Sequence, residues 1–213
     1  MNSACRDRHD LDAALAALRA DALVIVPTET VYGLAADAGN DTAVRRLYAA
    51  KARPAAQPLS LLVHDLAMAM RYGAFDERAR ALAARFWPGP LTLVVPRRAD
   101  APLSAAVNST GHSIAVRVPA QAQTLDLLKR FGRALAAPSA NRAGAPAPAR
   151  AADIAPAILA DAALCLAGEP GAGGASTLLR LEADGGRILR QGRVARAALA
   201  AALVRFGAAG HLL

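Results

Sequence analysis

VIVPTETVYGLAADAGNDTAVRRLYAAKARPAAQPLSLLV, residues 24–63, alternates between apolar runs and polar stretches in an order that suggests a binding site. An apolar run at 23–26 predicts a buried strand that ends at Pro27, and a second run at 59–63 predicts another strand. Hydroxyl side chains follow the first strand, and two cations precede the second. Such groups would form one polar, positive site, which suits an anionic ligand.

The two cations, Lys51 and Arg53, stand out against the composition of the chain. Of its 25 basic residues only two are lysine, Lys51 and Lys129, and the other 23 are arginine. A compact ammonium suits a phosphate, whereas the planar guanidinium of Arg53 suits a bidentate grip on an oxyanion. Composition alone leaves the alternative that Lys51 is an ordinary cation at a helix C-terminus, favoured by the helix dipole.

The length of 213 residues is sufficient for one well-filled core or two small ones. Hydrophobic residues make up 54% of the chain and the mean hydropathy is +0.25, but no run approaches the roughly 20 apolar residues of a membrane span. Residues 1–18 mix arginines with acids and lack a compact apolar region, so we expect no secretory signal. Cys5 and Cys165 cannot build a disulfide framework and lack metal-ligand spacing, so we expect the reducing compartment of the cytoplasm. Because no apolar run is long enough, we expect no membrane partner.

The net charge of +8 and the pI near 10.6 indicate affinity for anions, either nucleotide or nucleic acid. The chain has one Trp, three Tyr and four Phe, and none of them interleaves with a basic run. A stacking platform for single-stranded nucleic acid requires such aromatic faces. The charge is therefore compatible with affinity for tRNA or other RNA but does not establish it.

Along the rest of the chain, helical and strand patterns mix without strict alternation. Helices are predicted at 10–20, 42–50, 65–72, 76–86, 123–131, 151–160 and 195–206, with Asp41 as a candidate cap of the second. Further strands are predicted at 91–95, 113–118, 134–137, 162–167 and 176–181, the last followed by a hairpin turn at Gly185-Gly186. Gly33 is interpreted as a turn residue. No repeat or linker divides this order, so we expect one α/β domain with a twisted, mixed sheet.

Several common catalytic patterns are absent from the sequence. There is no Gly-x-x-x-x-Gly-Lys phosphate loop, and no Gly-x-Gly-x-x-Gly follows the first strand. The four histidines show no metal-ligand spacing, and no Gly-x-Ser-x-Gly elbow is present. The glycine-rich loop at 168–174 could bring backbone N–H groups to an anion, although a plain flexible turn explains it better.

Polar side chains recur where the predicted strands end. These residues are Thr28, Glu29, Thr30, Arg117, Ser139 and Asn141. Open α/β sheets bind ligands in the crevice beyond their strand ends, so we expect these side chains to share one site. Taken singly, each of them also fits a simpler role as a turn former or a surface charge.

Seven stretches of the sequence together match one known family. They are PTETVYGLAAD, KARP, PLSLLV, WPGPLTLV, IAVRVP, APSAN and ILRQGRV, in collinear order over about residues 23–194. The chain thereby resembles the YrdC-like threonylcarbamoyl-AMP synthases (TsaC/Sua type). The resemblance implies a single domain over 1–213, in the form without a C-terminal extension, with helices flanking a twisted sheet and a large, positively charged cavity.

The same resemblance implies an enzyme, a nucleotidyltransferase that converts L-threonine, bicarbonate and ATP into threonylcarbamoyl-AMP and pyrophosphate. A downstream enzyme complex would then transfer the threonylcarbamoyl group to the adenosine beside the anticodon of certain tRNAs. ATP would enter as its magnesium complex, held by phosphate oxygens and water. No protein metal site and no tightly bound prosthetic group are implied.

Carried over by position, the resemblance assigns roles to individual residues. Lys51 and Arg53 would be catalytic, because they would hold the nucleotide phosphates. The expected nucleotide-binding residues are Lys51, Arg53, Ser113, Ser139, Asn141 and Arg190. The expected threonine-binding residues are Thr28, Thr30, Arg117 and Ser176, with Tyr32 beside them and Arg117 on the carboxylate.

The chain also departs from the family pattern. Many relatives have a histidine near the position of Leu62; His64 lies two residues on, on the same face of a strand, and could substitute for it. Gln191 stands where a proline is common. Two alternatives remain: an RNA-binding module without catalysis, which predicts steeply salt-dependent RNA binding, and a carbamoyl-transfer protein of the hydrogenase-maturation type. The second expects fused zinc-finger segments, and the chain has no Cys-x-x-Cys.

Overall fold

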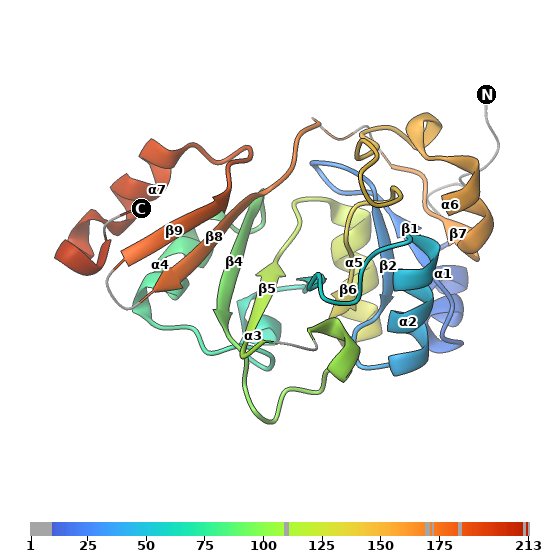
Figure 1. Ribbon diagram of the computed structural model, residues 1–213, viewed down its shortest axis with the longest axis horizontal. Helices are drawn as coiled ribbons and strands as arrows, with labels where there is room; N and C mark the ends of the chain where they lie inside the picture. Colours follow the sequence, from blue (N-terminus) through green and yellow to red (C-terminus); the bar gives the residue numbers. More distant parts are fainter. Residues whose placement is uncertain are drawn as a thin grey trace.

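In the computed structural model of the chain, residues 10–108, 111–168, 171, 173–182, 185–210 and 212 are described. These residues form a mixed sheet of nine strands with helices on both of its faces (Figure 1). The strand order is β7-β1-β2-β6-β3-β5-β4-β8-β9. The prediction of a twisted, mixed α/β sheet flanked by helices is confirmed.

Most predicted strands are present, with small shifts at their ends. They are β1 Val24–Val26, β2 Gly33–Asp37, β3 Ser60–Leu62, β4 Leu91–Pro96, β5 Ser113–Arg117, β6 Leu135–Ala136, β7 Leu164–Cys165, β8 Thr177–Glu182 and β9 Gly185–Arg190. Gly185 and Gly186 are not turn residues as expected, because they pair within β9 opposite Glu182 and Leu181.

Strand β2 is the element that the sequence interpretation missed. Gly33 opens this strand opposite Val26 instead of forming a turn of its own. The run GLAAD contains no β-branched or aromatic residue, so its strand propensity is weak. It is nevertheless buried throughout and pairs with β1 on one side and β6 on the other, so tertiary pairing determines its conformation.

The helices also follow the predicted order. They are α1 Leu11–Arg19, α2 Asp41–Ala50, α3 Leu66–Ala69, α4 Glu77–Phe86, α5 Ala122–Phe131, α6 Pro156–Asp161 and α7 Arg196–Leu203, with short 3-10 helices η1 Ala105–Val107, η2 Ala151–Asp153 and η3 Val204–Gly210. The cap of α2 is Asn40 and not Asp41, since the Asn40 side chain accepts from Ala43 N at 2.9 Å. The predicted helix at 151–160 is split, and its second part starts at Pro156, where a proline has no N–H bond to lose.

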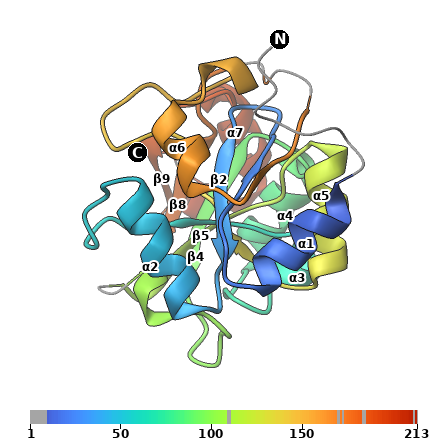
Figure 2. The same cartoon turned by 90° about the vertical axis from the view of Figure 1, so that its right-hand side faces the viewer.

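Alternation along β1 divides the core between the two faces of the sheet. Val24 and Val26 pack with Leu18 of α1 and Leu127 of α5 on one face. Ile25, between them, belongs to the larger cluster on the other face, which includes Leu47 of α2 and Ile158 of α6. Figure 2 shows α1 and α5 on one side of the sheet and α2 and α6 on the other.

Two observations concern the expectations about a membrane and about the cellular compartment of the protein. Within the described ranges, no helix combines the length and the apolar content that crossing a membrane would need. Cys165 is buried in β7 and is disulfide-bonded, so the cysteines no longer support the expectation of a reducing compartment; Cys5 lies outside the described residues.

Candidate functional site

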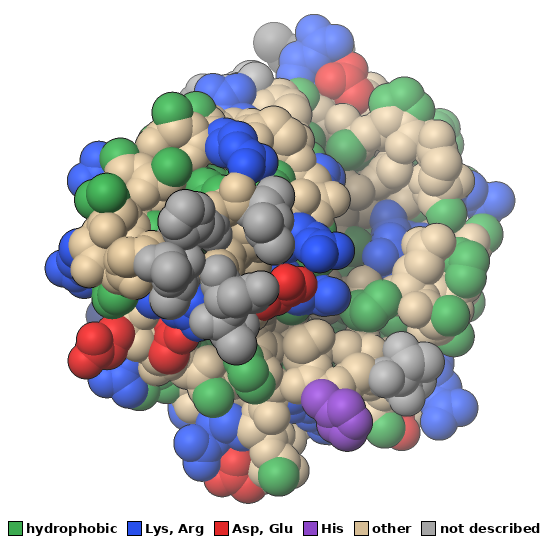
Figure 3. All heavy atoms as spheres, turned by 60° about the vertical axis from the view of Figure 1, so that its left-hand side comes forward, with side chains coloured by type: hydrophobic (Ala, Val, Ile, Leu, Met, Phe, Trp, Pro, Cys, Tyr) green, Lys and Arg blue, Asp and Glu red, His purple; other side chains and the backbone are tan. Residues whose placement is uncertain are grey.

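A cavity of about 200 Å³ brings together most of the predicted site residues. It is lined by the loop between β1 and β2, by the start of the loop after β6, and by residues of β3, β4, β5 and β9. Three lining side chains are arginines, Arg53, Arg117 and Arg190, and no carboxylate of the described residues lines it. Lys and Arg side chains gather around a hollow in the face drawn in Figure 3.

A larger hollow of about 740 Å³ lies between α2, η1 and the segments that flank β4 and β5. Its lining includes Asp41, Arg45, Tyr48, Arg97 and His112. None of the predicted site residues lines it. We therefore place the candidate site at the smaller cavity, where hydroxyl and guanidinium groups from distant parts of the chain converge.

The loop after β1 is organised by the hydroxyl of Thr28. Thr28 Oγ1 donates to Val31 O at 2.6 Å and accepts from the backbone N–H groups of Thr30 and Val31 at 3.3 and 3.2 Å. This is the local side-chain to backbone bonding that Thr favours in turns. The Thr28 and Thr30 hydroxyls are 2.9 Å apart, and both residues line the cavity. Tyr32 also lines it and donates to Gly168 O at 3.1 Å.

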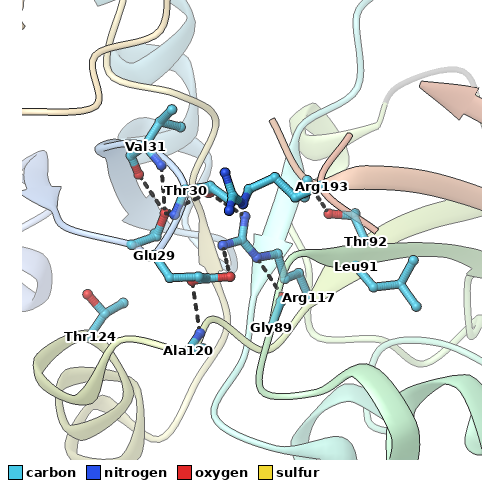
Figure 4. A network of polar contacts seen from close by, with 12 residues as sticks. Glu29, Thr30, Val31, Gly89, Leu91, Thr92, Arg117, Ala120, Thr124 and Arg193 are labelled. Atoms are coloured by element: carbon cyan, nitrogen blue, oxygen red, sulfur yellow. Dashed lines mark hydrogen bonds and ion pairs between the residues drawn. The ribbon is translucent and has the colours of Figure 1, made fainter. Parts of the chain in front are cut away.

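Arg117 is the buried centre of a polar network with this loop (Figure 4). Its Nη1 donates to Thr30 Oγ1 at 3.0 Å, its Nη2 to Glu29 Oε1 at 2.6 Å and its Nε to Gly89 O at 3.2 Å. The second oxygen of Glu29 accepts from Ala120 N at 2.9 Å. Burial lowers the pKa of Arg117, and the negative charge of Glu29 opposes that effect.

The strand ends that carry the predicted site residues do not all lie at one edge of the sheet. Three antiparallel steps and one parallel step lie between β1 and β5, so these two strands run in opposite directions. The ends of β1 and β6 do share an edge, where Gly33 bridges Ser139. Arg117 reaches the Thr30 loop through its long side chain, and alternate residues of β3, Ser60 and Leu62, also line the cavity.

Lys51 and Arg53 occupy different environments although one residue separates them. Lys51 is 2% exposed and does not line the cavity; its Nζ donates to the carbonyl oxygens of Ser139 and Asn141. Burial, together with the charge of Arg53, lowers the pKa of Lys51 to about 8. The residue between them, Ala52, has a left-handed φ of 47°, which turns the chain at the end of α2.

Arg53 lines the cavity. It donates through Nε to Gln57 O at 3.2 Å and through Nη2 to Pro58 O at 2.9 Å. Burial lowers its pKa, and both acceptors are neutral carbonyl groups. The guanidinium is thus held in place without a carboxylate among these partners.

The loop after β6 holds Ser139 and Asn141 against each other. The Ser139 hydroxyl donates to Asn141 Oδ1, and Asn141 Nδ2 donates to the carbonyls of Arg142 and Ala145 at 3.0 and 2.6 Å. Ser139 lines the cavity and Asn141 does not. Together with the Lys51 bonds, these contacts connect the segment 51–53 to the segment 139–141.

Ser176 and Arg190 form the wall of the cavity on the β8–β9 side. Arg190 donates to Ser176 O from Nε and Nη2 at 3.2 and 3.0 Å, and from Nη2 to Ser176 Oγ at 3.2 Å. Ser176 Oγ lies 2.7 Å from the hydroxyl of Thr92, a lining residue that the sequence interpretation missed. The sequence feature that could have identified Thr92 is its hydroxyl within the otherwise apolar run LTLVV.

Two expected residues lie away from the cavity. Ser113 starts β5, opposite Pro96, at the other end of the strand from Arg117. His64 lies beyond β3 with its Nδ1 3.1 Å from Asp65 Oδ2, and Leu62 lines the cavity instead. No group of three His, Cys, Asp or Glu side chains suited to a metal ion occurs in the part of the chain that the structure describes.

Residues 16–192 match a protein-family model described as "Telomere recombination", the Sua5/YciO/YrdC family. The chain is 38% identical over 185 residues to the threonylcarbamoyl-AMP synthase of Bacillus subtilis, covering 86% of this chain and 53% of that protein. It is 42% identical over 128 residues to the protein of the same name from Pyrococcus abyssi, covering 60% of this chain and 37% of that protein. The chain thus spans about half or less of the length of these relatives.

Solved structures share the architecture. P. abyssi Sua5 complexed with L-threonine superimposes with a TM-score of 0.87 at 33% identity, over 97% of this chain and 59% of that one. Escherichia coli YciO gives a TM-score of 0.78 at 19% identity, over 87% of this chain and 90% of that one, which shows the fold alone.

Proposed function

The chain belongs to the Sua5/YciO/YrdC family, and from this premise we propose that it is an L-threonylcarbamoyl-adenylate synthase. It joins L-threonine, bicarbonate and ATP to give threonylcarbamoyl-AMP and pyrophosphate. The observation that supports this most is the cavity that Arg117 and Thr30 share with two further arginines, Arg53 and Arg190. The comparison with a relative solved with bound L-threonine supports it independently.

Arg117 suits the carboxylate of the amino acid. A guanidinium carries five N–H groups, and three of them are used by Thr30, Glu29 and Gly89. One N–H on each terminal nitrogen is then left for a ligand. Arginine and carboxylate form strong, charge-assisted pairs, so this edge of the cavity is the amino-acid subsite.

The nucleotide phosphates lie on the side of Arg53, Arg190 and Ser139, which line the same cavity. Lys51 adds positive charge from behind the loop after β6. The volume of about 200 Å³ is below the range of roughly 300–1,000 Å³ that small-molecule sites usually have. The nucleoside therefore extends beyond the cavity, and the magnesium of MgATP is held by phosphate oxygens and water.

The chemistry needs orientation more than a strong base. The neutral amine of threonine attacks the carbon of bicarbonate, and loss of water gives a carbamate. A carbamate oxygen then attacks the α-phosphorus of ATP, and pyrophosphate leaves with the electron pair of the broken P–O bond. Arginines neutralise the charge that develops, and holding the carbamate in line supplies much of the rate.

The product is a mixed anhydride of a carbamate and a phosphate, and such bonds hydrolyse readily. An acceptor must therefore use it promptly. On the ground of this reaction, and not of its cysteines, we place the protein in the cytoplasm, as a single YrdC-like unit over 1–213. It would act upstream of the complex that modifies the adenosine beside the anticodon of tRNA. Affinity of its basic surface for tRNA belongs to the same proposal.

The test is pyrophosphate release from ATP, measured with and without L-threonine and bicarbonate. We expect release to require both, and L-serine to support less. Release with neither substrate indicates another nucleotide enzyme. No release under any condition, with salt-dependent binding of RNA, supports a binding module instead.

A further inference from the structure

Glu29 has no role in the chemistry above, yet its carboxylate is fixed at both oxygens. Oε1 accepts from Arg117 Nη2 at 2.6 Å, and Oε2 accepts from the backbone N–H of Ala120 at 2.9 Å. Its side chain is 21% exposed, whereas that of Arg117 is 8% exposed. An acid held in this way at a buried arginine needs an explanation, because burying the pair costs hydration free energy.

Three anchors from separate segments fix the plane of the Arg117 guanidinium. Gly89 O holds Nε, the Thr30 hydroxyl holds Nη1, and Glu29 holds Nη2. Of these anchors only Glu29 is charged, so it forms the strongest bond. Figure 4 shows Glu29 and Thr30 both directed at the guanidinium from the loop after β1.

Glu29 does not occupy the place of a ligand carboxylate. Arg117 and Thr30 line the cavity, but Glu29 is not among the residues that line it. Its second oxygen is tied to the backbone that leads into α5, so it need not leave when a ligand binds. The acid supports the guanidinium from outside the cavity.

We propose that Glu29 is a positioning residue of the amino-acid subsite, which orients Arg117 so that its remaining N–H groups face the carboxylate of the substrate. This inference rests on the proposed function. A positioning role and a purely electrostatic role of Glu29 predict opposite changes in anion affinity when its charge is removed. If Glu29 only neutralised Arg117, removing its charge would leave a more positive site and strengthen the binding of an anion. If it orients Arg117, the same change weakens binding.

The experiment compares the wild-type protein with Glu29→Gln, Glu29→Asp and the control Glu77→Gln, whose side chain is exposed at the start of α4. Calorimetry gives the Kd of L-threonine and of L-threoninamide, which lacks the carboxylate. Pyrophosphate release gives KM separately for threonine and ATP. Gln keeps the size of the side chain, but only its oxygen accepts hydrogen bonds. It can therefore accept from Arg117 or from Ala120 N, but not hold both as Glu29 does with its two oxygens.

We expect Glu29→Gln to weaken threonine binding by about 10-fold to 100-fold, the range for one lost bond between charged groups. Threoninamide binding and the KM for ATP should change by less than about 3-fold. Glu29→Asp keeps the charge but is too short to span both partners, so an intermediate loss is expected; if Glu29→Gln does not fold, this variant decides. Glu77→Gln should match the wild type.

Equal or tighter threonine binding by Glu29→Gln overturns the inference, and so does an equal loss for threonine and threoninamide. Both results leave the proposed function intact, because the wild type still releases pyrophosphate. If the wild type neither binds threonine nor releases pyrophosphate, the proposed function fails, independently of the variants.

Discussion

The two sides of the cavity hold their cations in different ways. On the amino-acid side, defined by Arg117 with Glu29 and Thr30, the guanidinium is paired with a carboxylate. The phosphate side is defined by Arg53, which lines the cavity, and by Lys51, which lies behind the loop after β6. The partners of these two cations are backbone carbonyl groups of residues 57, 58, 139 and 141. One side is compensated in charge, and the other keeps its positive charge.

This difference matches the ligands that the two sides would bind. An amino acid brings one carboxylate, for which orientation of a single fork of donors matters most. A polyphosphate brings several charges, for which uncompensated cations matter more. Burial is the main cause that lowers the pKa of Lys51, and the positive charge of Arg53 adds to it. A bound polyanion would favour the charged form of Lys51 and so oppose both effects.

Lys51→Ala should cause the greatest loss, because it removes a cation and also the clamp on the loop after β6. We expect pyrophosphate release to fall about 100-fold or more. Two partly buried carbonyls, those of Ser139 and Asn141, lose their partner, so the free energy of unfolding should drop by about 1–3 kcal/mol. The matched control is Lys129→Ala, which removes the only other lysine from the exposed face of α5. Normal turnover in Lys51→Ala would refute the assignment.

Arg117→Ala should act on one substrate only. It removes the carboxylate fork and leaves Glu29 without its cation, so the KM for threonine should rise about 100-fold. The KM for ATP should change by less than about 3-fold. Initial rates with each substrate varied in turn provide the measurement. An unchanged KM for threonine excludes Arg117 from the amino-acid subsite.

The affinity of the phosphate side for ATP should depend on pH through Lys51, whereas among the described residues the amino-acid side has no group with a comparable role. The pKa of Lys51 is about 8 in the folded protein, against 10.5 for the free side chain, so its charge is lost as pH rises through 8. ATP affinity measured by calorimetry should therefore fall between pH 7 and pH 9.5. Lys51→Arg keeps its charge and should flatten the profile; an equal fall in this variant contradicts the assignment.

The same pKa shift predicts the sign of a stability effect. Between pH 8 and 10.5 the unfolded chain binds more protons at Lys51 than the folded chain does. The contribution of Lys51 to the free energy of unfolding therefore rises with pH across this window, and below pH 8 the full cost of burying the ammonium is present.

Ala52→Gly should give the smallest effect. Ala52 holds a left-handed φ of 47°, which costs a residue with a side chain about 1–2 kcal/mol. Glycine relieves this strain but gains freedom in the unfolded chain, worth about 0.4–1 kcal/mol. We expect a net gain of up to about 1 kcal/mol in thermal unfolding. A loss of stability would mean that the turn between Lys51 and Arg53 is not strained.

Much of the fold could be predicted because local signals were strong. Apolar runs ended by proline located β1, β4 and β5 to within one or two residues. β2 could not be recognised in the same way, since its conformation depends on pairing with β1 and β6 rather than on the residues of GLAAD. The directions of the strands were also hidden, because register and order are set by contacts between distant segments.

The same distinction between local signals and contacts with distant segments applies to the site residues. Lys51 could be singled out by the rarity of lysine, and Arg117 by its place at a strand end. Glu29 could not be assigned, because an acid between two threonines resembles an exposed turn and its partner lies 88 residues away. The burial of Lys51 was hidden for the same reason: its acceptors, Ser139 O and Asn141 O, are far along the chain.

Formation of the mixed anhydride is the step on which the proposed function depends most. The direct measurement is mass spectrometry of the nucleotide products after incubation with ATP, L-threonine and bicarbonate labelled with carbon-13. We predict a threonylcarbamoyl-AMP ion that carries the label and disappears when threonine is left out. Formation of ADP, or of AMP without any labelled adduct at early times, would contradict the account.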